Sequence, residues 1–370
     1  MAWMKASEAL AKLPEVVLHG RFLFSYDGIP IFAENLSSKQ KANILKLGLS
    51  TLLRKDRIFG LPAVIQIEPT NVCNMKCPLC PAAEEAGDRM NGFMSYEMFQ
   101  RILGELGDVL IAAYLYSWGE PFLNRDIFRM IAACTARNIR TLIPTNGQFL
   151  QNREEAAALV DSGLSAIIIA LDGSTQEIYE TYRKGGNVEK VKRCAALIEE
   201  AKSLRNSQFP YTCLRTVVTR DNQDDLPSLE RLSRDLGVNM FSTKTVGCKI
   251  LDEAFRDFEP TRESLRRFVY EGGERIDKPS IKCIFPFRQP TIKWDGTVVG
   301  CEFDLDLENP FGRLDEQDFT EIWNFPQARA LRRRIRKGIR GGFCEKHCPY
   351  QDRVQDGSAI QNLELRPLQV

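Results

Sequence analysis

Six short apolar segments alternate with helix-like segments between residues 62 and 247, and this alternation limits the fold more than any other feature. The apolar segments are typical of buried strands, and the segments between them carry apolar residues at helical spacing. Parallel strands joined by right-handed helical crossovers give a parallel α/β sheet. The sequence therefore predicts either an open doubly wound sheet or an incomplete barrel. The expected strands are residues 63–69, 110–117, 140–147, 164–173, 211–219 and 238–247, and the expected helices are residues 95–106, 125–138, 153–163, 188–204 and 226–237.

The segments on either side of this alternation are expected to form units of their own. In the N-terminal segment, residues 37–55 have apolar residues at helical spacing behind a serine N-cap, which predicts a mostly helical extension. After about residue 250 the alternation stops, and residues 291–301 predict a β-hairpin with Asp295-Gly296 as its turn. We expect an N-terminal extension at residues 1–61, the α/β domain at 62–250, a C-terminal domain at 251–350 and a polar tail at 351–370.

The overall charge gives no reason to expect nucleic acid or a membrane surface as a partner. The chain has 370 residues, with 50 Lys and Arg against 49 Asp and Glu. The longest strongly apolar run, residues 164–171, is too short to span a bilayer. The N-terminus lacks the apolar core and cleavage site of a signal peptide, so we expect a cytoplasmic protein without a membrane span.

Histidine is scarce and cysteine is abundant in this chain. Only His19 and His347 are present, which argues against Ser-His-Asp hydrolases and HExxH zinc peptidases. Eleven cysteines in so long a chain, kept reduced in a cytoplasm, favour metal binding over disulfides. Any chemistry must therefore depend on cysteine-bound metal, carboxylates, Lys or Arg.

Three cysteines, Cys73, Cys77 and Cys80, follow directly after the first expected strand. Parallel α/β folds bind ligands at the C-terminal ends of their strands, so this loop is expected at the ligand-binding edge. A tetrahedral zinc and a ferredoxin cluster each need four protein ligands, and the next cysteine, Cys134, is too distant to belong to the loop. Either a ligand comes from elsewhere, or one metal position is open to a ligand that is not protein.

The C-x3-C-x2-C spacing of these cysteines resembles the cluster signature of the radical SAM superfamily. Residues 116–124, 144–147 and 170–173 resemble further motifs of that family in the family's order, each at an expected strand end. The resemblance covers roughly residues 62–247 and implies an α/β fold of the partial (β/α)6 TIM-like barrel type. It also implies a [4Fe–4S] cluster that binds S-adenosylmethionine (SAM) and cleaves it to a 5′-deoxyadenosyl radical, which removes hydrogen from a substrate. An external electron donor such as flavodoxin or ferredoxin is implied as well.

The same resemblance implies which residues bind the cofactors. It implies backbone acceptors for the SAM amine in the segment Gly119–Pro121 and a cation for the SAM carboxylate at Arg183. The fourth-strand motif more often begins with Ser, whereas this chain has Ala170, so the contact to the SAM ribose must come from elsewhere. The implied cluster ligands are Cys73, Cys77 and Cys80, and the implied cofactor-binding residues are Gly119, Glu120, Pro121, Thr145, Asn146, Asp172 and Arg183.

Four later cysteines resemble the ligands of an auxiliary-cluster region of the SPASM or twitch type. Cys283, Cys301, Cys344 and Cys348 imply a second [4Fe–4S] auxiliary cluster in a twitch/SPASM-like domain of a β-hairpin plus helix, with structural zinc as the alternative. A cluster with four thiolates is negatively charged, which gives the basic residues 331–342 a simpler role than binding nucleic acid. We expect the remaining cysteines, Cys134, Cys194, Cys213 and Cys248, to be buried apolar residues.

Three further residues are candidates for acting on the substrate. Glu302 directly follows Cys301, where the sulfatase-maturing branch of the family has an acidic base, so the resemblance implies a catalytic general base here. A solvated hairpin carboxylate is the alternative. Arg215 and Lys244, on the fifth and sixth expected strands, are predicted to face the barrel interior and bind an anionic or hydroxylated substrate. Surface or salt-bridged cations are the alternative for both.

Our first functional hypothesis is a radical SAM oxidoreductase of the dehydrogenase type. It would oxidise a small hydroxylated metabolite, such as a sugar or aminocyclitol, by two electrons, with the auxiliary cluster as electron acceptor. The alternative is a maturase that modifies a peptide or protein side chain by oxidation or by C–C or C–S bond formation. The short N-terminal extension weakens that alternative, because such maturases often begin with a larger peptide-recognition domain. A third class is an electron carrier or a zinc-stabilised scaffold.

Overall fold

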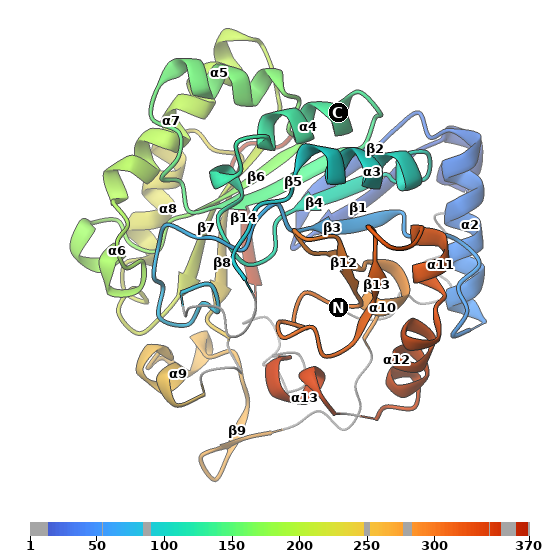
Figure 1. The fold of residues 1–370 in the computed structure, drawn as a ribbon. Helices are drawn as coiled ribbons and strands as arrows, with labels where there is room; N and C mark the ends of the chain where they lie inside the picture. Colours follow the sequence, from blue (N-terminus) through green and yellow to red (C-terminus); the bar gives the residue numbers. More distant parts are fainter. Residues whose placement is uncertain are drawn as a thin grey trace.

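The computed structural model describes residues 14–53, 55–83, 90–247, 252–276, 283–339, 341–348 and 360–368. A ten-stranded sheet of order β13-β12-β11-β3-β4-β5-β6-β7-β8-β14 forms its centre (Figure 1). The strands β3 to β8 are parallel and lie in chain order, which is the arrangement of an incomplete barrel and confirms the six predicted strands. These strands are β3 (Val64–Ile67), β4 (Ala112–Leu115), β5 (Arg140–Thr145), β6 (Ala166–Ala170), β7 (Tyr211–Val218) and β8 (Met240–Thr245).

Helices cover one face of these six strands, which we call the outer face (Figure 1). Most of these helices begin behind a polar side chain that accepts a hydrogen bond from a backbone N–H of the first turn. The capping side chains are Ser95, Asn152, Thr175 and Asn187. The helices are α3 (Tyr96–Leu106), α4 (Ile127–Thr135), α5 (Arg153–Asp161), α6 (Gln176–Tyr182), α7 (Val188–Leu204) and α8 (Leu226–Asp235).

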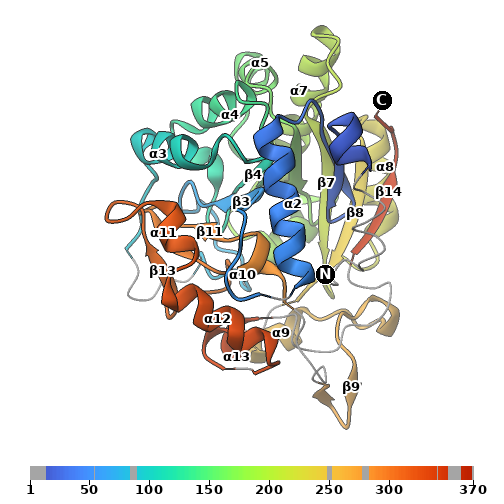
Figure 2. The ribbon, with the colours of Figure 1, turned by 90° about the vertical axis from the view of Figure 1, so that its right-hand side faces the viewer.

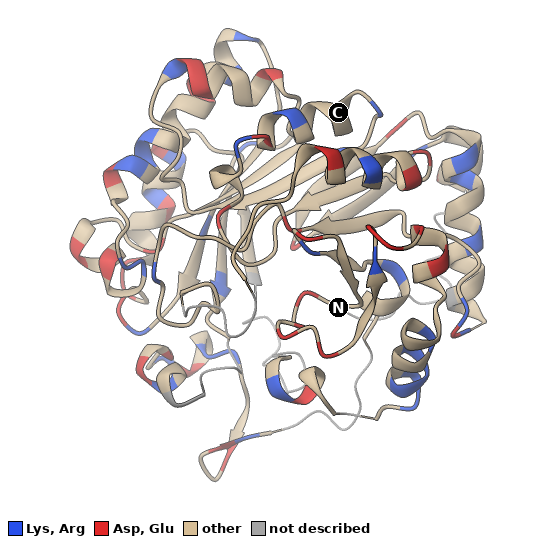
Figure 3. Ribbon diagram, viewed as in Figure 1, with Lys and Arg blue, Asp and Glu red and all other residues tan. Residues whose placement is uncertain are grey.

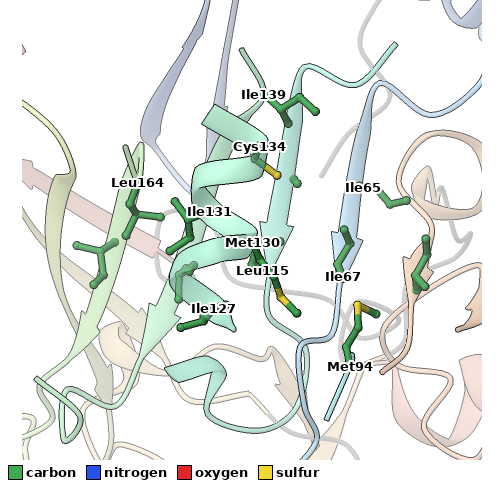
Figure 4. Packing of buried hydrophobic residues seen from close by; sticks show 14 of the residues in the cluster. Ile65, Ile67, Met94, Leu115, Ile127, Met130, Ile131, Cys134, Ile139 and Leu164 are labelled. Atoms are coloured by element: carbon green, nitrogen blue, oxygen red, sulfur yellow. The ribbon is translucent and has the colours of Figure 1, made fainter. Parts of the chain in front are cut away.

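The contact between α4 and the sheet shows how the outer face is packed (Figure 4). Ile127, Met130, Ile131 and Cys134 lie on one side of α4 and are at most 2% exposed. They pack against buried strand residues such as Leu115. Burying an aliphatic side chain of this size stabilises the fold by about 1.5–3 kcal/mol. The helical spacing of apolar residues seen in the sequence therefore corresponds to the buried side of the helix.

The opposite face of the sheet, the inner face, is covered by an N-terminal β-hairpin that was not predicted. Strands β1 (Phe22–Tyr26) and β2 (Ile29–Ala33) pair antiparallel, and Ile29 and Ile31 pack onto the sheet in a separate apolar cluster. The expectation of a mostly helical extension is thus wrong for this segment, although the predicted helix is present as α2 (Ser38–Leu52). Figure 2 shows α2 beside the hairpin. The π-helical turn η1 (Glu15–His19) precedes the hairpin.

Both edges of the parallel sheet are extended by segments from the C-terminal part of the chain. The predicted hairpin forms as β11 (Thr291–Ile292) and β12 (Thr297–Val299), and β11 pairs parallel with β3. Strand β13 (Pro310–Arg313) pairs with β12. At the other edge β14 (Ile360–Glu364) pairs antiparallel with β8 (Figure 2), so the expected polar tail in fact contains a strand of the sheet. The C-terminal region therefore shares one sheet with the barrel.

The remaining C-terminal elements pack beside this extended sheet. Arg332 is fully buried, stacks over the Trp323 ring at 4.1 Å and donates to the Pro286 carbonyl at 2.7 Å. Part of the basic stretch 331–342 is thus an internal packing element. The elements are α9 (Asp252–Phe258), η3 (Glu263–Leu265), β9 (Tyr270–Glu271), β10 (Glu274–Arg275), α10 (Phe285–Arg288), α11 (Phe319–Trp323), α12 (Pro326–Arg336) and α13 (Phe343–His347).

Charged residues of both signs are interleaved along the outer helices (Figure 3). This mixture agrees with the nearly balanced composition. Within the part of the chain that the structure describes, no helix combines the length and the apolar character needed to cross a bilayer.

Candidate functional site

The three-cysteine loop follows β3 at the C-terminal edge of the sheet, as predicted. Cys77 is buried, whereas Cys73 and Cys80 are partly exposed. Burial and, next, the neighbouring Cys77 raise the pKa of the Cys80 thiol to about 12. Cys73 also contributes to this rise, so the three sulfurs lie in one electrostatic neighbourhood. The structure thus brings together the three predicted cluster ligands.

Backbone contacts fix this loop to the end of β4. The Glu120 N–H donates to the Val72 carbonyl at 2.8 Å, directly before Cys73. Gly119 has φ +120°, and a Cβ atom there would lie 2.6 Å from the Thr70 carbonyl oxygen. Only glycine allows so close an approach of the two backbones. The short helical turn η2 (Pro121–Leu123) follows at once, so the segment Gly119–Pro121 is held against the cysteine loop.

The Glu120 side chain points to the end of β5. Its carboxylate accepts from Thr145 Oγ1 at 2.9 Å and from the Asn146 N–H at 2.8 Å. Burial raises the pKa of Glu120 to about 7, and these hydrogen bonds oppose the rise. The carboxylate therefore ties the ends of β4 and β5 together.

Asn146 connects the third strand end to the cysteine loop. Its Nδ2 lies 2.7 Å from Asn74 Oδ1 and 4.0 Å from Cys73 Sγ. Asn74 stands between the first two cysteines in the sequence, and its role was not predicted. The cysteine spacing could not predict the contact of Asn74 with Asn146, because the motif allows any residue at position 74.

Asp172 and Arg183 form a buried ion pair beside the loop. Asp172 Oδ2 pairs with Arg183 Nε, while its Oδ1 accepts from the Val217 N–H at 2.6 Å. Arg183 Nη1 lies 3.7 Å from Cys77 Sγ. The predicted carboxylate-binding cation is thus next to the three-cysteine loop, and its position is fixed by the aspartate at the end of β6.

The four later cysteines come together from separate segments. Cys283 precedes α10, Cys301 follows β12, and Cys344 and Cys348 lie in and directly after α13. After burial, Cys348 and Cys344 contribute most to raising the pKa of Cys283 to about 12. Cys283 and Cys348 likewise raise the pKa of Cys301. Burial raises the pKa of Cys344, and Arg334 of the basic stretch opposes this rise, which agrees with the expected role of these cations.

The donor chemistry of both cysteine sets fits iron–sulfur clusters. Thiols with raised pKa values, such as those of Cys80 and Cys283, are neutral at pH 7, and a bound metal makes them ionise. Cys73, Cys77 and Cys80 would hold one cluster and leave one position free of protein. The four later cysteines would hold the other cluster. Among the residues described by the structure, no three His, Cys, Asp or Glu side chains are grouped as they would be around a single metal ion.

Glu302 lies between the barrel strands and the C-terminal hairpin. Gln66 Nε2 donates to its carboxylate at 2.7 Å, and Trp118 Nε1 donates to its backbone carbonyl at 3.1 Å. Burial raises the pKa of Glu302. Its carboxylate is therefore held on the inner side of the sheet and is not a solvated hairpin group.

A buried ion pair supports this position. Lys293, on the hairpin, and Glu68, at the end of β3, are both 0% exposed and lie 3.5 Å apart. Lys293 Nζ also lies 3.5 Å from the Glu302 carbonyl oxygen. Neither residue was predicted, because their contact joins segments more than two hundred residues apart.

Arg215 and Lys244 face the inner side of the sheet together, as predicted. Arg215 shares its strand face with Cys213, and Lys244 shares its face with Met240, both of which belong to the inner apolar cluster. Both cations pair with Asp27, in the turn of the N-terminal hairpin, at 3.1 Å and 3.5 Å, so both are salt-bridged, as the alternative expected. Sequence reasoning missed Asp27, although Asp-Gly between two apolar segments is a strong hairpin signal.

Cysteines outside the two sets behave as expected. Cys134, Cys194 and Cys213 are fully buried in the apolar clusters, which confirms their structural role. Cys248 lies outside the described residues.

Sequence comparison identifies the two parts of the chain. Residues 67–232 match the radical SAM superfamily, and residues 283–349 match the SPASM iron–sulfur cluster-binding domain. These segments contain the three-cysteine loop and the four later cysteines, respectively. The chain is therefore a radical SAM protein with a C-terminal SPASM domain. Radical SAM domains bind a [4Fe–4S] cluster and SAM, and SPASM domains bind auxiliary iron–sulfur clusters.

Individual relatives are distant. The chain is 26% identical over 188 residues to the PqqA peptide cyclase of Bradyrhizobium diazoefficiens, covering 51% of this chain and 47% of the relative. It is 26% identical to the mycofactocin maturase MftC of Mycolicibacterium smegmatis, covering 60% and 55%. The chain thus spans about half the length of the curated relatives it matches. Among solved structures, Streptococcus suis SuiB bound to the precursor peptide SuiA matches with a TM-score of 0.57 at 17% identity, covering 84% and 74%, which shows a shared fold.

Proposed function

We propose that this chain is a radical SAM enzyme that modifies a side chain of a peptide or protein substrate. The observation that carries the proposal is that two of the curated relatives are named PqqA peptide cyclase and mycofactocin maturase. These relatives favour the maturase alternative over the small hydroxylated metabolite that was our first hypothesis.

The proposed roles of the chain's own residues follow from their positions. Cys73, Cys77 and Cys80 would hold the SAM-binding cluster. The other residues that would contact SAM are Gly119, Glu120, Pro121, Thr145, Asn146 and Asp172. When bound, this cluster and SAM supply the removal of a hydrogen atom from an unactivated carbon. Arg183 is the proposed partner of the SAM carboxylate. Two observations support this role: a guanidinium matches the geometry of a carboxylate, and Arg183 Nη1 lies 3.7 Å from Cys77 Sγ.

The four later cysteines are proposed to provide an acceptor for the electron that remains on the substrate radical. Cys283, Cys301, Cys344 and Cys348 would hold an auxiliary cluster, and that cluster would supply an electron acceptor. Glu302, which adjoins Cys301, would take the proton that the substrate radical loses after a hydrogen atom has been removed from its carbon. Its hydrogen bond from Gln66 orients the carboxylate towards the inner face of the sheet. An external one-electron donor, such as flavodoxin or ferredoxin, starts each turnover.

The experiment that tests this proposal is anaerobic turnover by the reconstituted full chain with SAM and reductant. One arm contains short peptides encoded beside the gene, deuterated at candidate side-chain carbons. The other arm contains deuterated sugars and aminocyclitols. Deuterium transferred from a peptide into 5′-deoxyadenosine, with a matching mass change of the peptide, is the expected result. Transfer from a sugar or cyclitol and from none of the peptides would overturn the peptide assignment.

A further inference from the structure

The inner face of the parallel sheet changes from apolar to polar along the strand direction. Near the start of the strands, the hairpin residues Ile29 and Ile31 complete a buried apolar cluster. Towards the strand ends, the same face carries Gln66, Arg215 and Lys244. The sheet residues of the apolar cluster are Ala112, Tyr114, Leu142, Ala166, Ile168, Tyr211, Cys213 and Met240.

Asp27 lies where these two layers meet. Its Oδ2 is 3.1 Å from Arg215 Nη1 and 3.5 Å from Lys244 Nζ. One carboxylate thus faces two cations on the inner face of the sheet. The Arg215 side chain is 9% exposed, and its Nη2 is buried without a hydrogen-bond partner among the described residues. A buried guanidinium nitrogen without a partner is costly and marks a place where an acceptor is missing.

The rest of the cluster is held firmly. Arg215 Nε donates to Ser242 Oγ at 3.3 Å, which fixes the plane of the guanidinium. Asn362 of β14 donates to the Asp27 carbonyl at 3.0 Å and so anchors the hairpin turn to the edge of the sheet. Tyr26, next to Asp27, packs edge-on against Tyr114 with ring centroids 4.9 Å apart. Contacts from the N-terminal hairpin and from β14 therefore fix the position of the Asp27 carboxylate.

The cluster is also close to the proposed general base. Burial lowers the pKa of Lys244, and Asp27 and Glu302 are the two carboxylates that oppose this shift. Arg215 lies opposite Ala170 in the β6–β7 register, and Ala170 ends the strand that leads to Asp172. A group bound at Arg215 and Lys244 would thus lie on the inner side of the sheet, the side on which Gln66 holds the Glu302 carboxylate.

We propose that Arg215 and Lys244 bind a carboxylate group of the peptide substrate and that Asp27, presented by the N-terminal hairpin, restricts this site to a single negative charge. The proposal rests on the proposed function. Arg215 Nη2 and the unshared protons of Lys244 Nζ are the donors for the incoming carboxylate, and such charge-assisted bonds are the stronger class. A carboxylate adds charge attraction to these hydrogen bonds, whereas a neutral group does not.

Binding measured by calorimetry tests the proposal without turnover. The protein is the reconstituted full chain with SAM, and the probes are N-acetyl-glutamate α-amide, its neutral isostere N-acetyl-glutamine α-amide and N-acetyl-alanine. We expect at least about tenfold tighter binding of one carboxylate probe than of the neutral amide. The glutamate probe represents a side-chain carboxylate and the alanine probe a chain terminus, so the tighter one identifies the source. Equal binding of all three probes, or binding of none, would overturn the proposal.

Variants then test the roles of the individual residues. Asp27→Asn keeps the shape of the turn but removes the competing charge, so the carboxylate probe should bind about tenfold tighter while the neutral probe is unchanged. Arg215→Gln and Lys244→Gln should each abolish the preference. Lys202→Gln is the matched control, because Lys202 is a buried cation paired with Glu199 on the outer helix α7.

Two outcomes contradict the proposal at the level of the variants. They are an unchanged preference in Asp27→Asn and a preserved preference in both Gln variants at the cations. Thermal unfolding of each variant confirms that it is folded. Turnover of a peptide without any carboxylate preference would refute this site and leave the proposed function standing. A carboxylate preference with turnover of cyclitols alone would refute the proposed function instead.

Discussion

The two cysteine sets are built in opposite ways. The first set comes from a single loop after β3, and neighbouring strand ends hold that loop through the Glu120 N–H and the Arg183 guanidinium. The second set collects Cys283, Cys301 and the two cysteines near α13 from three segments. The first site is therefore prepared by the barrel itself, whereas the second depends on the folding of the C-terminal region around it.

This difference predicts a difference in what each site contributes. A loop that is already fixed by the barrel can lose a metal ligand and keep its fold. A site that joins distant segments stabilises those segments when metal is bound, because its binding free energy is also folding free energy. Loss of a cysteine at the first site should therefore abolish SAM cleavage. Loss of a cysteine at the second site should abolish the oxidised product and also lower the free energy of unfolding.

The largest expected effect is that of Cys77→Ala. This change removes one of three ligands, so we expect complete loss of SAM cleavage, because SAM has no cluster to bind. The midpoint of thermal unfolding of the barrel should change little. The measurements are 5′-deoxyadenosine by chromatography and unfolding by circular dichroism. Residual SAM cleavage close to that of the unmodified chain would contradict the ligand assignment.

Cys301→Ala should act mainly on stability and on product formation. Removal of a metal site is among the few changes that destabilise a protein by on the order of 4 kcal/mol or more. We expect the free energy of unfolding of Cys301→Ala to fall by this amount. SAM cleavage should continue without oxidised product. Cys134→Ala is the control, because Cys134 is buried outside both sets, and it should cost about 1 kcal/mol. Equal losses in the two variants would remove the contrast between the cysteine sets.

Glu302→Gln tests the connection between the two sites. The amide cannot take a proton, so the rate of product formation should fall by about 10²–10⁴-fold, the usual contribution of a general base. SAM cleavage should be preserved, because Glu302 lies outside the three-cysteine loop. Glu308→Gln, which removes a carboxylate paired with Lys346, is the matched control and should leave the rate unchanged. A product rate in Glu302→Gln equal to that of the control would dismiss the base assignment.

Gly119→Ala should have the smallest effect. Its Cβ would lie 2.6 Å from the Thr70 carbonyl oxygen, so we expect a loss of about 1–3 kcal/mol in unfolding free energy and weaker SAM binding. Gly185→Ala provides the comparison, because Gly185 also has positive φ but has nothing within 4 Å of a built Cβ. The difference between the two variants isolates the close approach of the two backbones. Equal losses would show that only backbone strain matters there.

Features encoded by local sequence could be predicted. The strands of the barrel, the helix Val188–Leu204 and the hairpin at Thr291–Val299 follow from apolar periodicity and turn residues. The three-cysteine loop and the motif at Gly119 could also be placed, because strand ends of a parallel sheet meet at one edge.

Contacts between distant segments could not be predicted in the same way. Strand β14 pairs with β8 across more than a hundred residues, and the polar sequence of residues 351–370 gives no sign of a partner. Asp27 meets Arg215 across 188 residues. The hairpin had a local signal in Asp27 and the glycine after it, yet its position on the inner face depends on which apolar surface the barrel leaves uncovered.

The most direct test of the central claim is electron paramagnetic resonance of the reduced, reconstituted full chain before and after SAM is added. If Cys73, Cys77 and Cys80 hold a cluster that is open to SAM, addition of SAM will change the signal of that cluster. The same addition will have no effect on Cys77→Ala, which keeps only the auxiliary signal. An unmodified chain whose spectrum is the same with and without SAM would contradict the claim.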